Sequence, residues 1–130
     1  MTPAVTSRPF SAQEEQFVEQ TIIQFASATA NRDIYSMHYL LHENFQALVV
    51  DEEETLVSKS DYMKMLVEKN FGGEQQKVEI PYLDVSLNTA AAKVKIIGKD
   101  VKTEVYCHLF MNANGSWQIL HVLQYATERI

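Results

Sequence analysis

The chain has one cysteine, no long hydrophobic run and few basic residues, and each of these shortages excludes a class of protein. Cys107 is the only cysteine, so an internal disulfide and a zinc site built from several cysteines are both excluded. No apolar run approaches the roughly 18 residues that a membrane-spanning helix needs. Eleven Lys and Arg against 17 Asp and Glu give a formal net charge of -6. This charge argues against nucleic acid or an anionic membrane as the main partner.

Two further absences concern location and metal. Residues 1–10 lack the basic and apolar regions of a signal peptide, so a cytoplasmic location is the expectation. The histidines are His38, His42, His108 and His121. His38 and His42 have the spacing of one helical face, but an HExxH motif is absent. We therefore expect no metal and no cofactor.

The length of 130 residues suits a single domain that buries roughly two thirds of its unfolded surface. Residues 1–10 contain two prolines and no periodicity, which predicts a mobile N-terminal arm. A single domain over residues 11–130 follows the arm.

Helical periodicity covers the first part of this domain. Ser11 with Glu14 forms a capping box, and apolar residues at three-and-four spacing predict a helix over about residues 12–30. Asp33 predicts the N-cap of a short second helix that ends at about Leu41.

A short strand and a third helix follow. Residues 45–50 predict a strand, and the acidic run 51–54 predicts a hairpin tip, because four like charges repel one another and stay solvated. Ser58 with Asp61 predicts the start of a third helix, which the glycine pair 72–73 ends. The inward stripe of this helix comprises Tyr62, Met65, Leu66 and Phe71.

From residue 78 the hydrophobic period changes from 3.6 to two, which predicts strands over residues 78–87 and 90–97 and then a hairpin. Asn114-Gly115 predicts a two-residue type I′ turn at its centre. This turn would oppose three pairs across the hairpin: His108 with His121, Tyr106 with Leu123, and Phe110 with Ile119. Helices followed by an antiparallel sheet predict an α+β domain.

Both faces of the two hairpin strands are apolar or aromatic. A small monomer usually leaves one sheet face polar, so we expect helices to cover one face and a partner subunit the other. The alternative is that the C-terminal residues cover the outer face. The interface that we predict for a two-fold homodimer comprises Tyr106, His108, Phe110, Trp117, Ile119, His121, Leu123 and Tyr125. At such an interface His108 and His121 would form two stacked neutral imidazoles; the alternative is a transition metal bound by this pair and its symmetry mates. Charging the two rings is unfavourable, so the dimer should weaken as the pH falls.

The order of these elements resembles the nuclear transport factor 2-like superfamily over nearly the whole chain, from Ser11 to Ala126. The residues that carry the resemblance are 31–33 (NRD), 41–45 (LHENF) and 114–119 (NGSWQI). The stretch DVSLNTAAAKVKI, followed by VYCHLF and NGSWQIL, is similar to the bacterial lumazine-binding branch, near the SnoaL-like and ketosteroid-isomerase-like groups. The resemblance implies a cone in which a curved, mostly antiparallel sheet wraps around three N-terminal helices. It also implies a pocket at the open end and a sheet-to-sheet dimer.

The resemblance does not bring catalytic residues with it. Ketosteroid isomerases use a tyrosine, an aspartate base and a protonated aspartate, and these positions fall at Phe25, Val49 and Cys107 here. None of the three supplies the required acid or base. Cys107 on an apolar strand face is typical of a small buried hydrophobe rather than a nucleophile.

The residues that we expect to line the cone are mainly apolar, with a few neutral polar tips. They are Phe25, Val49, Tyr62, Leu66, Val94, Ile96, Val105, Cys107, Leu120 and Gln124. Such a lining suits an aromatic or hydrophobic ligand held by burial and one or two hydrogen bonds. The same side chains could instead meet and fill the cone.

The sequence thus predicts a small-molecule-binding domain without evident catalytic residues. One alternative is an isomerase, dehydratase or cyclase that uses Tyr62 with Gln124, or a carboxylate such as Asp84 turned inward by a bulge. The other alternative is a protein-association module that uses its outer sheet face.

Overall fold

The computed structural model describes residues 3–68 and 77–129, which form three helices and one six-stranded sheet. The helices are α1 (Pro3–Asn31), α2 (Ile34–Leu40) and α3 (Lys59–Val67). The strands are β1 (Leu41–Val50), β2 (Glu54–Ser58), β3 (Lys77–Ser86), β4 (Thr89–Ile97), β5 (Val101–Met111) and β6 (Trp117–Arg129). No helix within these ranges is both long and apolar enough to cross a membrane.

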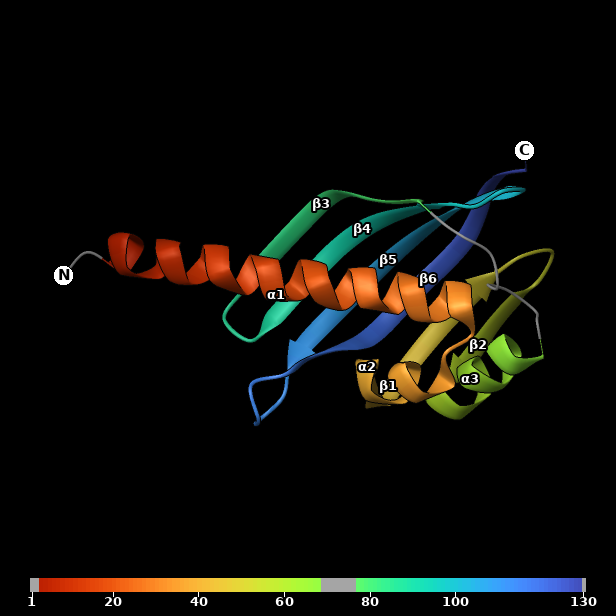
Figure 1. Ribbon diagram of the computed structural model, residues 1–130, viewed down its shortest axis with the longest axis horizontal. Coiled ribbons are helices and arrows are strands. Elements are labelled where there is room, and N and C mark those ends of the chain that lie inside the picture. Colours follow the sequence, from red (N-terminus) through yellow and green to blue (C-terminus); the bar gives the residue numbers. More distant parts are fainter. Residues whose placement is uncertain (1–2, 69–76, 130) are drawn as a thin grey trace.

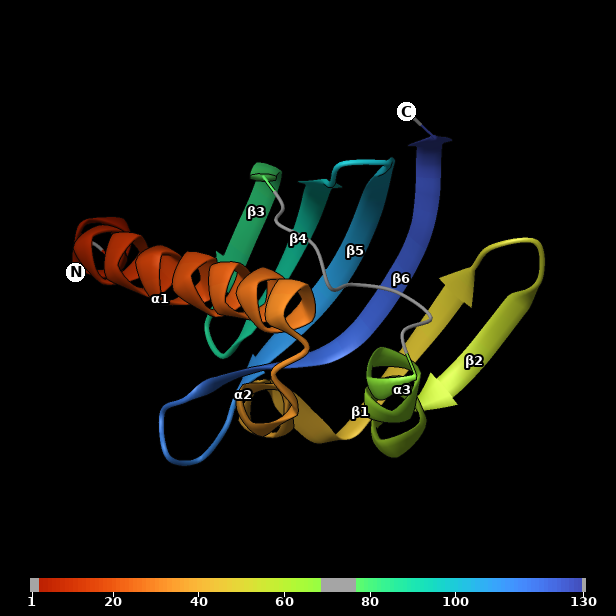
Figure 2. The same ribbon diagram turned by 45° about the vertical axis from the view of Figure 1, so that its right-hand side comes forward.

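The sheet has the strand order β2-β1-β6-β5-β4-β3. All neighbours pair antiparallel except β1 and β6, which are parallel. The sheet curves, α1 crosses its inner face, and α2 and α3 lie near β1 (Figures 1 and 2). This arrangement confirms the expected α+β cone.

Side-chain caps set the starts of α2 and α3 where the sequence predicts them. The Asp33 carboxylate accepts hydrogen bonds from the Ser36 hydroxyl at 2.7 Å and the Ser36 backbone N–H at 3.1 Å. These bonds hold the pKa of the Asp33 carboxyl below its usual value. Ser58 Oγ accepts a bond from the Asp61 N–H at 3.4 Å. Both predicted N-caps are therefore confirmed.

Two predicted boundaries differ from the structure. α1 begins at Pro3, so residues 3–10, which we expected in an arm, belong to the helix. α2 ends at Leu40 and β1 begins at Leu41, so His38 and His42 do not share a helical face. Residues 1–2, Phe71 and the glycine pair 72–73 lie outside the described residues.

The hydrophobic core lies between the helices and the inner face of the sheet. Its main members are Val18, Ile22 and Phe25 of α1, Tyr62 and Leu66 of α3, and Val94, Ile96, Val105, Cys107, Leu109, Ile119 and Val122 of the sheet. The acidic run, residues 51–54, is by contrast exposed to solvent. Its residues 51–53 form the β1–β2 turn, in which the Asp51 N–H donates to the Glu53 carbonyl at 2.9 Å. The predicted hairpin tip is confirmed.

The loop between β5 and β6 has five residues, 112–116, so the predicted two-residue type I′ turn is wrong. Gly115 is the only residue of the loop with a positive φ, at 82°, whereas a type I′ turn also needs one at Asn114. The Asn112 N–H donates to the Ser116 carbonyl at 2.8 Å. The Asn112 side chain also accepts from the N–H groups of Asn114 and Ser116, at 2.9 and 3.1 Å. This Asn112 side chain holds the longer loop.

A β-bulge at Leu120 accompanies the longer loop. His108 pairs with His121, but Leu109 pairs with Ile119, so Leu120 is an extra residue in β6. The predicted pairs His108–His121 and Tyr106–Leu123 are confirmed. Phe110 pairs with Gln118 rather than with Ile119 as predicted. The inward set of β6 therefore changes from Trp117 and Ile119 before the bulge to Val122 and Gln124 after it.

Candidate functional site

A buried hydrogen bond joins α3 to β6 in the apolar interior. The Tyr62 hydroxyl donates to Oε1 of Gln124 at 2.8 Å. Tyr62 is fully buried and Gln124 is 9% exposed. The Ser58 cap places Tyr62 in the first turn of α3, and the Leu120 bulge turns Gln124 inward. Two residues that sequence reasoning named as a possible pair therefore meet.

Aromatic rings surround the Tyr62 end of this pair. The Phe25 ring stacks on Tyr62 with centroids 6.4 Å apart, and the Phe45 ring meets it edge-on at 5.1 Å. Burial, with a smaller contribution from nearby Cys107, raises the pKa of the Tyr62 phenol above its usual value. Tyr62 is therefore a neutral hydrogen-bonding group at physiological pH.

The Gln124 amide has more hydrogen-bonding capacity than its surroundings use. A glutamine side chain carries two N–H donors and a carbonyl acceptor, and the Tyr62 bond is the only hydrogen bond of this side chain within residues 3–68 and 77–129. Its neighbours across the two adjacent strands are the apolar Val49 and Val105. A buried polar group without a partner costs about 1–3 kcal/mol. A bound molecule or water with a matching polar atom would offset this cost.

Cys107 lies in the same interior and is 6% exposed. Burial raises the pKa of its thiol to about 12. The protonated thiol is a weak nucleophile, which agrees with the interpretation of Cys107 as a small buried hydrophobe. No three His, Cys, Asp or Glu side chains of the described residues are grouped so that they could hold a metal.

The structure collects most of the expected lining residues in one interior. Phe25, Tyr62, Leu66, Val94, Ile96, Val105, Cys107 and Gln124 are buried, and Val49 is half-buried against them. Leu120 was expected in this interior, and that prediction is wrong: Leu120 lines a groove on the outer face together with His121. The bulge places both residues on that face. Asp84 is exposed and lines the same groove, so it is not the inward carboxylate that a catalytic alternative needs.

The outer face differs from the predicted interface at two positions. Trp117 is 6% exposed, and its indole N–H donates to a carboxylate oxygen of Glu14 in α1 at 2.7 Å. Ile119 is 1% exposed. Both side chains belong to the inner face, because they precede the bulge. The remaining predicted interface residues are exposed or half-buried: Tyr106, His108, Phe110, His121, Leu123 and Tyr125.

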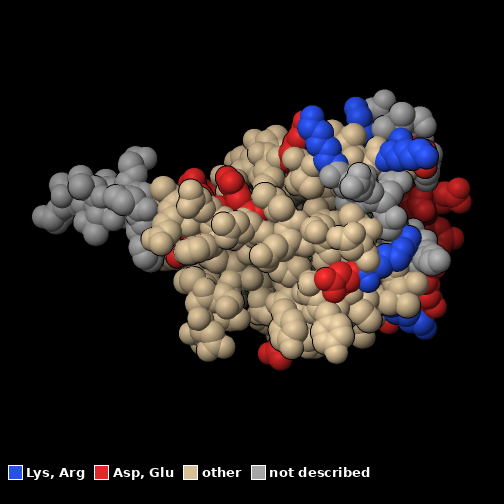
Figure 3. Space-filling model, in the orientation of Figure 1, with Lys and Arg blue, Asp and Glu red and all other residues tan. Residues whose placement is uncertain are grey.

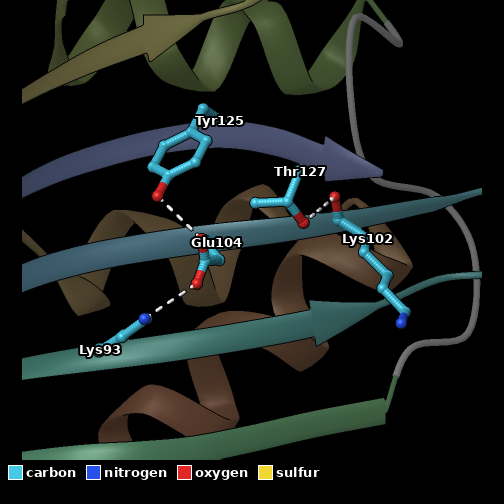
Figure 4. Close-up of polar contacts among 5 residues, drawn as sticks. All are labelled: Lys93, Lys102, Glu104, Tyr125 and Thr127. Atoms are coloured by element: carbon cyan, nitrogen blue, oxygen red, sulfur yellow. Dashed lines mark hydrogen bonds and ion pairs between the residues drawn. The ribbon is translucent and has the colours of Figure 1, made fainter. Parts of the chain in front are cut away.

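An ion pair and two tyrosines form a connected network on the outer face. Glu104 contacts Lys93 Nζ at 3.1 Å and accepts a hydrogen bond from the Tyr125 hydroxyl at 2.8 Å (Figure 4). The Tyr106 and Tyr125 rings stack at 6.2 Å, and Lys93 Nζ lies 5.5 Å from the Tyr106 centroid. The bonds from Tyr125 and Lys93 lower the pKa of Glu104, and the bond to Glu104 raises the pKa of Lys93. Both groups therefore stay charged over a wide pH range.

Two grooves meet at the His108–His121 pair. One, of about 560 Å³, is lined in part by Tyr82, Lys93, Tyr106 and Leu123. The other, of about 440 Å³, is lined in part by Asp84, Phe110 and Leu120. Both include Ala91, His108 and His121. The two imidazoles are thus accessible from both grooves.

The opposite side of the molecule, where α1 lies, has a different surface. Charged side chains gather mostly at the end near α3 and β2 and leave a broad uncharged area (Figure 3). A third depression, of about 390 Å³, lies between α1 and α2 and has a polar lining that includes Gln24, Ser27 and Ser36. The aromatic grooves of the outer sheet face are therefore distinct from this helical surface.

Comparison of the whole fold identifies its class. The chain superposes on an NTF2-like protein of unknown function from Silicibacter pomeroyi with a TM-score of 0.80 and 12% identity, over 89% of this chain and 98% of the other. An NTF2-like protein from Shewanella baltica gives a TM-score of 0.78 and 13% identity, over 90% and 96% of the two chains. The fold is that of the nuclear transport factor 2-like, or cystatin-like, proteins.

A third neighbour extends the comparison to proteins named for an isomerase. It is a ketosteroid isomerase-like protein from Erwinia carotovora atroseptica, with a TM-score of 0.75 and 14% identity, over 88% of this chain and 97% of the other. No protein-family model and no curated protein matches the sequence. At these identities the comparisons show the fold alone, so function depends on the residues of the site.

Proposed function

We propose that this protein binds a small, planar, mainly apolar molecule inside the cone and does not transform it. The observation that carries the proposal is the buried Tyr62–Gln124 pair. It places a neutral phenol and an amide with unused donors in an otherwise apolar interior. Ligand pockets combine these two features, a mostly hydrophobic lining and a few fixed polar groups.

The Gln124 amide favours one ligand chemistry over others. Its N–H groups can donate to a carbonyl or ring nitrogen, and its oxygen can accept from a ligand N–H. A charged ligand group would have to give up its hydration without an opposite charge beside it, at a large cost. A neutral heterocycle with a carbonyl edge satisfies the amide at the lowest cost. The resemblance to the lumazine-binding branch leads us to propose a pteridine such as lumazine as the first ligand to test.

The test is a fluorescence titration of the purified protein with lumazine, together with native mass spectrometry before and after denaturation. We expect saturable binding, or a reproducible small-molecule mass carried through purification. The variant Gln124→Met keeps the side-chain length and removes the amide, so binding should weaken by about tenfold or more. Gln46→Met, an exposed position on β1, is the matched control and should bind as the wild type does. Equal ligand binding by Gln124→Met would contradict the proposal.

We also propose that the outer sheet face binds a second copy of this chain. Tyr106 and Leu123 are 39% and 37% exposed and line the larger groove of this face. Lys93 and Glu104 neutralise each other at 3.1 Å, so this face presents aromatic area without an unpaired charge from them. Aromatic residues and few unpaired charges are typical of interface centres. Sedimentation of the wild type against Tyr106→Glu tests this: the wild type should be a dimer and the variant a monomer.

A further inference from the structure

The His108–His121 pair has a geometry that suits metal binding. The two residues are directly opposed on the antiparallel strands β5 and β6. Their ring centroids are 6.0 Å apart and their planes meet at 74°. Both side chains are exposed. The Leu120 bulge lies next to His121, and bulges commonly re-aim a neighbouring side chain.

These histidines belong to a row of opposed residues that crosses four strands. Asp84 of β3 pairs with Ala91 of β4, Ala91 pairs with His108, and His108 pairs with His121. The small Ala91 side chain keeps the groove open between the Asp84 carboxylate and the imidazoles, and all four residues line that groove. A carboxylate near metal-binding histidines commonly orients their rings and favours the bound cation.

The other charged groups near this row do not oppose a cation strongly. Lys93 lines the larger groove, but its ammonium group is paired with Glu104. Tyr82 and Tyr106 line the same groove with aromatic rings and add no cationic side chain to it. The protein as a whole has a formal net charge of -6, which favours the approach of a divalent cation.

We propose that His108 and His121 form half of a transition-metal site that the same two residues of a second copy complete. Imidazole nitrogen selects zinc, copper, nickel or cobalt over magnesium or calcium. Zinc takes histidine nitrogen at about 2.0–2.1 Å, so the ion lies about 3 Å from each ring centre. Two rings at a tetrahedral angle are then about 5 Å apart. Small rotations of the His108 and His121 side chains shorten the observed centroid distance of 6.0 Å to this value.

The number of ligands explains why a second copy is needed. Zinc sites in proteins have three or four protein ligands, and within the described part of one subunit no three candidate side chains are grouped. A two-fold axis through the outer face near His108 and His121 brings four imidazoles together. The metal site therefore rests on the proposed dimer, and it requires the two-fold axis of that dimer to pass near His108 and His121.

The test is zinc binding by the full chain after dialysis against a chelator, measured by calorimetry and repeated with cobalt by visible spectroscopy. We expect about one zinc ion per two chains and the intense visible bands of tetrahedral cobalt. His108→Ala and His121→Ala should each weaken zinc binding by about 100-fold or more, because loss of an indirect partner alone costs 10–100-fold. His38→Ala, an exposed histidine on α2, is the matched control and should bind zinc as the wild type does.

Sedimentation in the presence of the chelator separates failure of the metal site from failure of the dimer. A chelated dimer that binds zinc no better than His108→Ala/His121→Ala overturns the metal site and leaves the dimer standing. A monomer with and without zinc overturns both proposals. Zinc binding that survives the double substitution also overturns the assignment, because the ion is then held elsewhere.

Discussion

The inner and outer faces of one sheet present opposite chemistry, although the same two strands, β5 and β6, build both. The inner face holds the neutral Tyr62–Gln124 pair among apolar side chains. The outer face holds the Lys93–Glu104 ion pair and two exposed imidazoles. Burial makes charge costly on the inner face, and exposure to solvent makes it inexpensive on the outer face. The two faces are therefore suited to different partners.

A single residue decides which side chains reach which face. If Leu120 took a regular place in the strand instead of forming a bulge, Trp117 and Ile119 would share a face with His121 and Leu123. The reason is that side chains alternate along a regular strand. With the bulge, the first two residues lie inside and the other two lie outside. The contrast between the faces of β6 thus depends on one inserted position.

A one-residue shift in β6 should have the largest effect of the changes we consider. Deletion of Leu120 alone keeps Ile119, Val122 and Gln124 on the inner face, because His121 then follows Ile119 directly and the alternation is unbroken. Insertion of one alanine between Val122 and Leu123 instead turns Leu123 inward and Gln124 outward, since a one-residue shift exchanges the faces. For the insertion we expect a loss of about 4 kcal/mol or more in the free energy of unfolding, measured by urea denaturation. Deletion of Leu120 is the control, with an expected loss of about 1 kcal/mol. An insertion variant as stable as this control would show that the register of β6 does not set its two faces.

The reactivity of Cys107 measures how strictly the inner face excludes charge. With a pKa of about 12, the folded protein at about pH 8 holds roughly a thousandfold less thiolate than an unperturbed thiol with a pKa near 8.5. Labelling by a disulfide reagent should therefore be slow in the native protein and fast in denaturant. Rapid labelling under native conditions would mean that solvent reaches the interior.

Removal of one partner from the Tyr62–Gln124 pair should have an intermediate effect. Tyr62→Phe leaves the Gln124 amide without its partner, so we expect a loss of about 1–3 kcal/mol in the free energy of unfolding. The double variant Tyr62→Phe/Gln124→Met removes both polar groups and should recover most of that loss. A double variant less stable than Tyr62→Phe would show that the amide is satisfied in another way.

The smallest effect concerns the outer face and pH. The lowered pKa of Glu104 means that its stabilising contribution is present above its unfolded pKa and is lost only as the pH falls through the lower folded pKa. The raised pKa of Lys93 keeps this residue charged at neutral pH and below. The ion pair therefore stays constant between about pH 7.5 and pH 5.5, so the small loss of unfolding free energy in Glu104→Gln, measured by urea denaturation, should be the same at both pH values. A loss that differs between them would contradict this.

The caps, the order of elements and most interior residues followed from sequence patterns with a direct physical cause. Ser58 and Asp33 cap helices because their side chains accept backbone N–H bonds. Apart from the start of α1 and the α2–β1 boundary, the errors lie in one hairpin. There Asn114-Gly115 favoured a two-residue turn, but the Asn112 side chain holds a longer loop. A signal for the bulge was present: Gln118 and His121, two polar residues of β6, are three residues apart, so a strand of strict period two would place them on opposite faces. The orientation of Leu120, Trp117 and Ile119 depended on it.

The parallel pairing of β1 with β6 has a consequence for the order of folding during synthesis. β6 lies between β1 and β5, so two halves of the sheet stay unconnected until this last strand leaves the ribosome. Until then β1 and β5 each present an open edge, and open edges favour association with other chains. The nascent protein is therefore most exposed to aggregation just before the synthesis of β6 is complete.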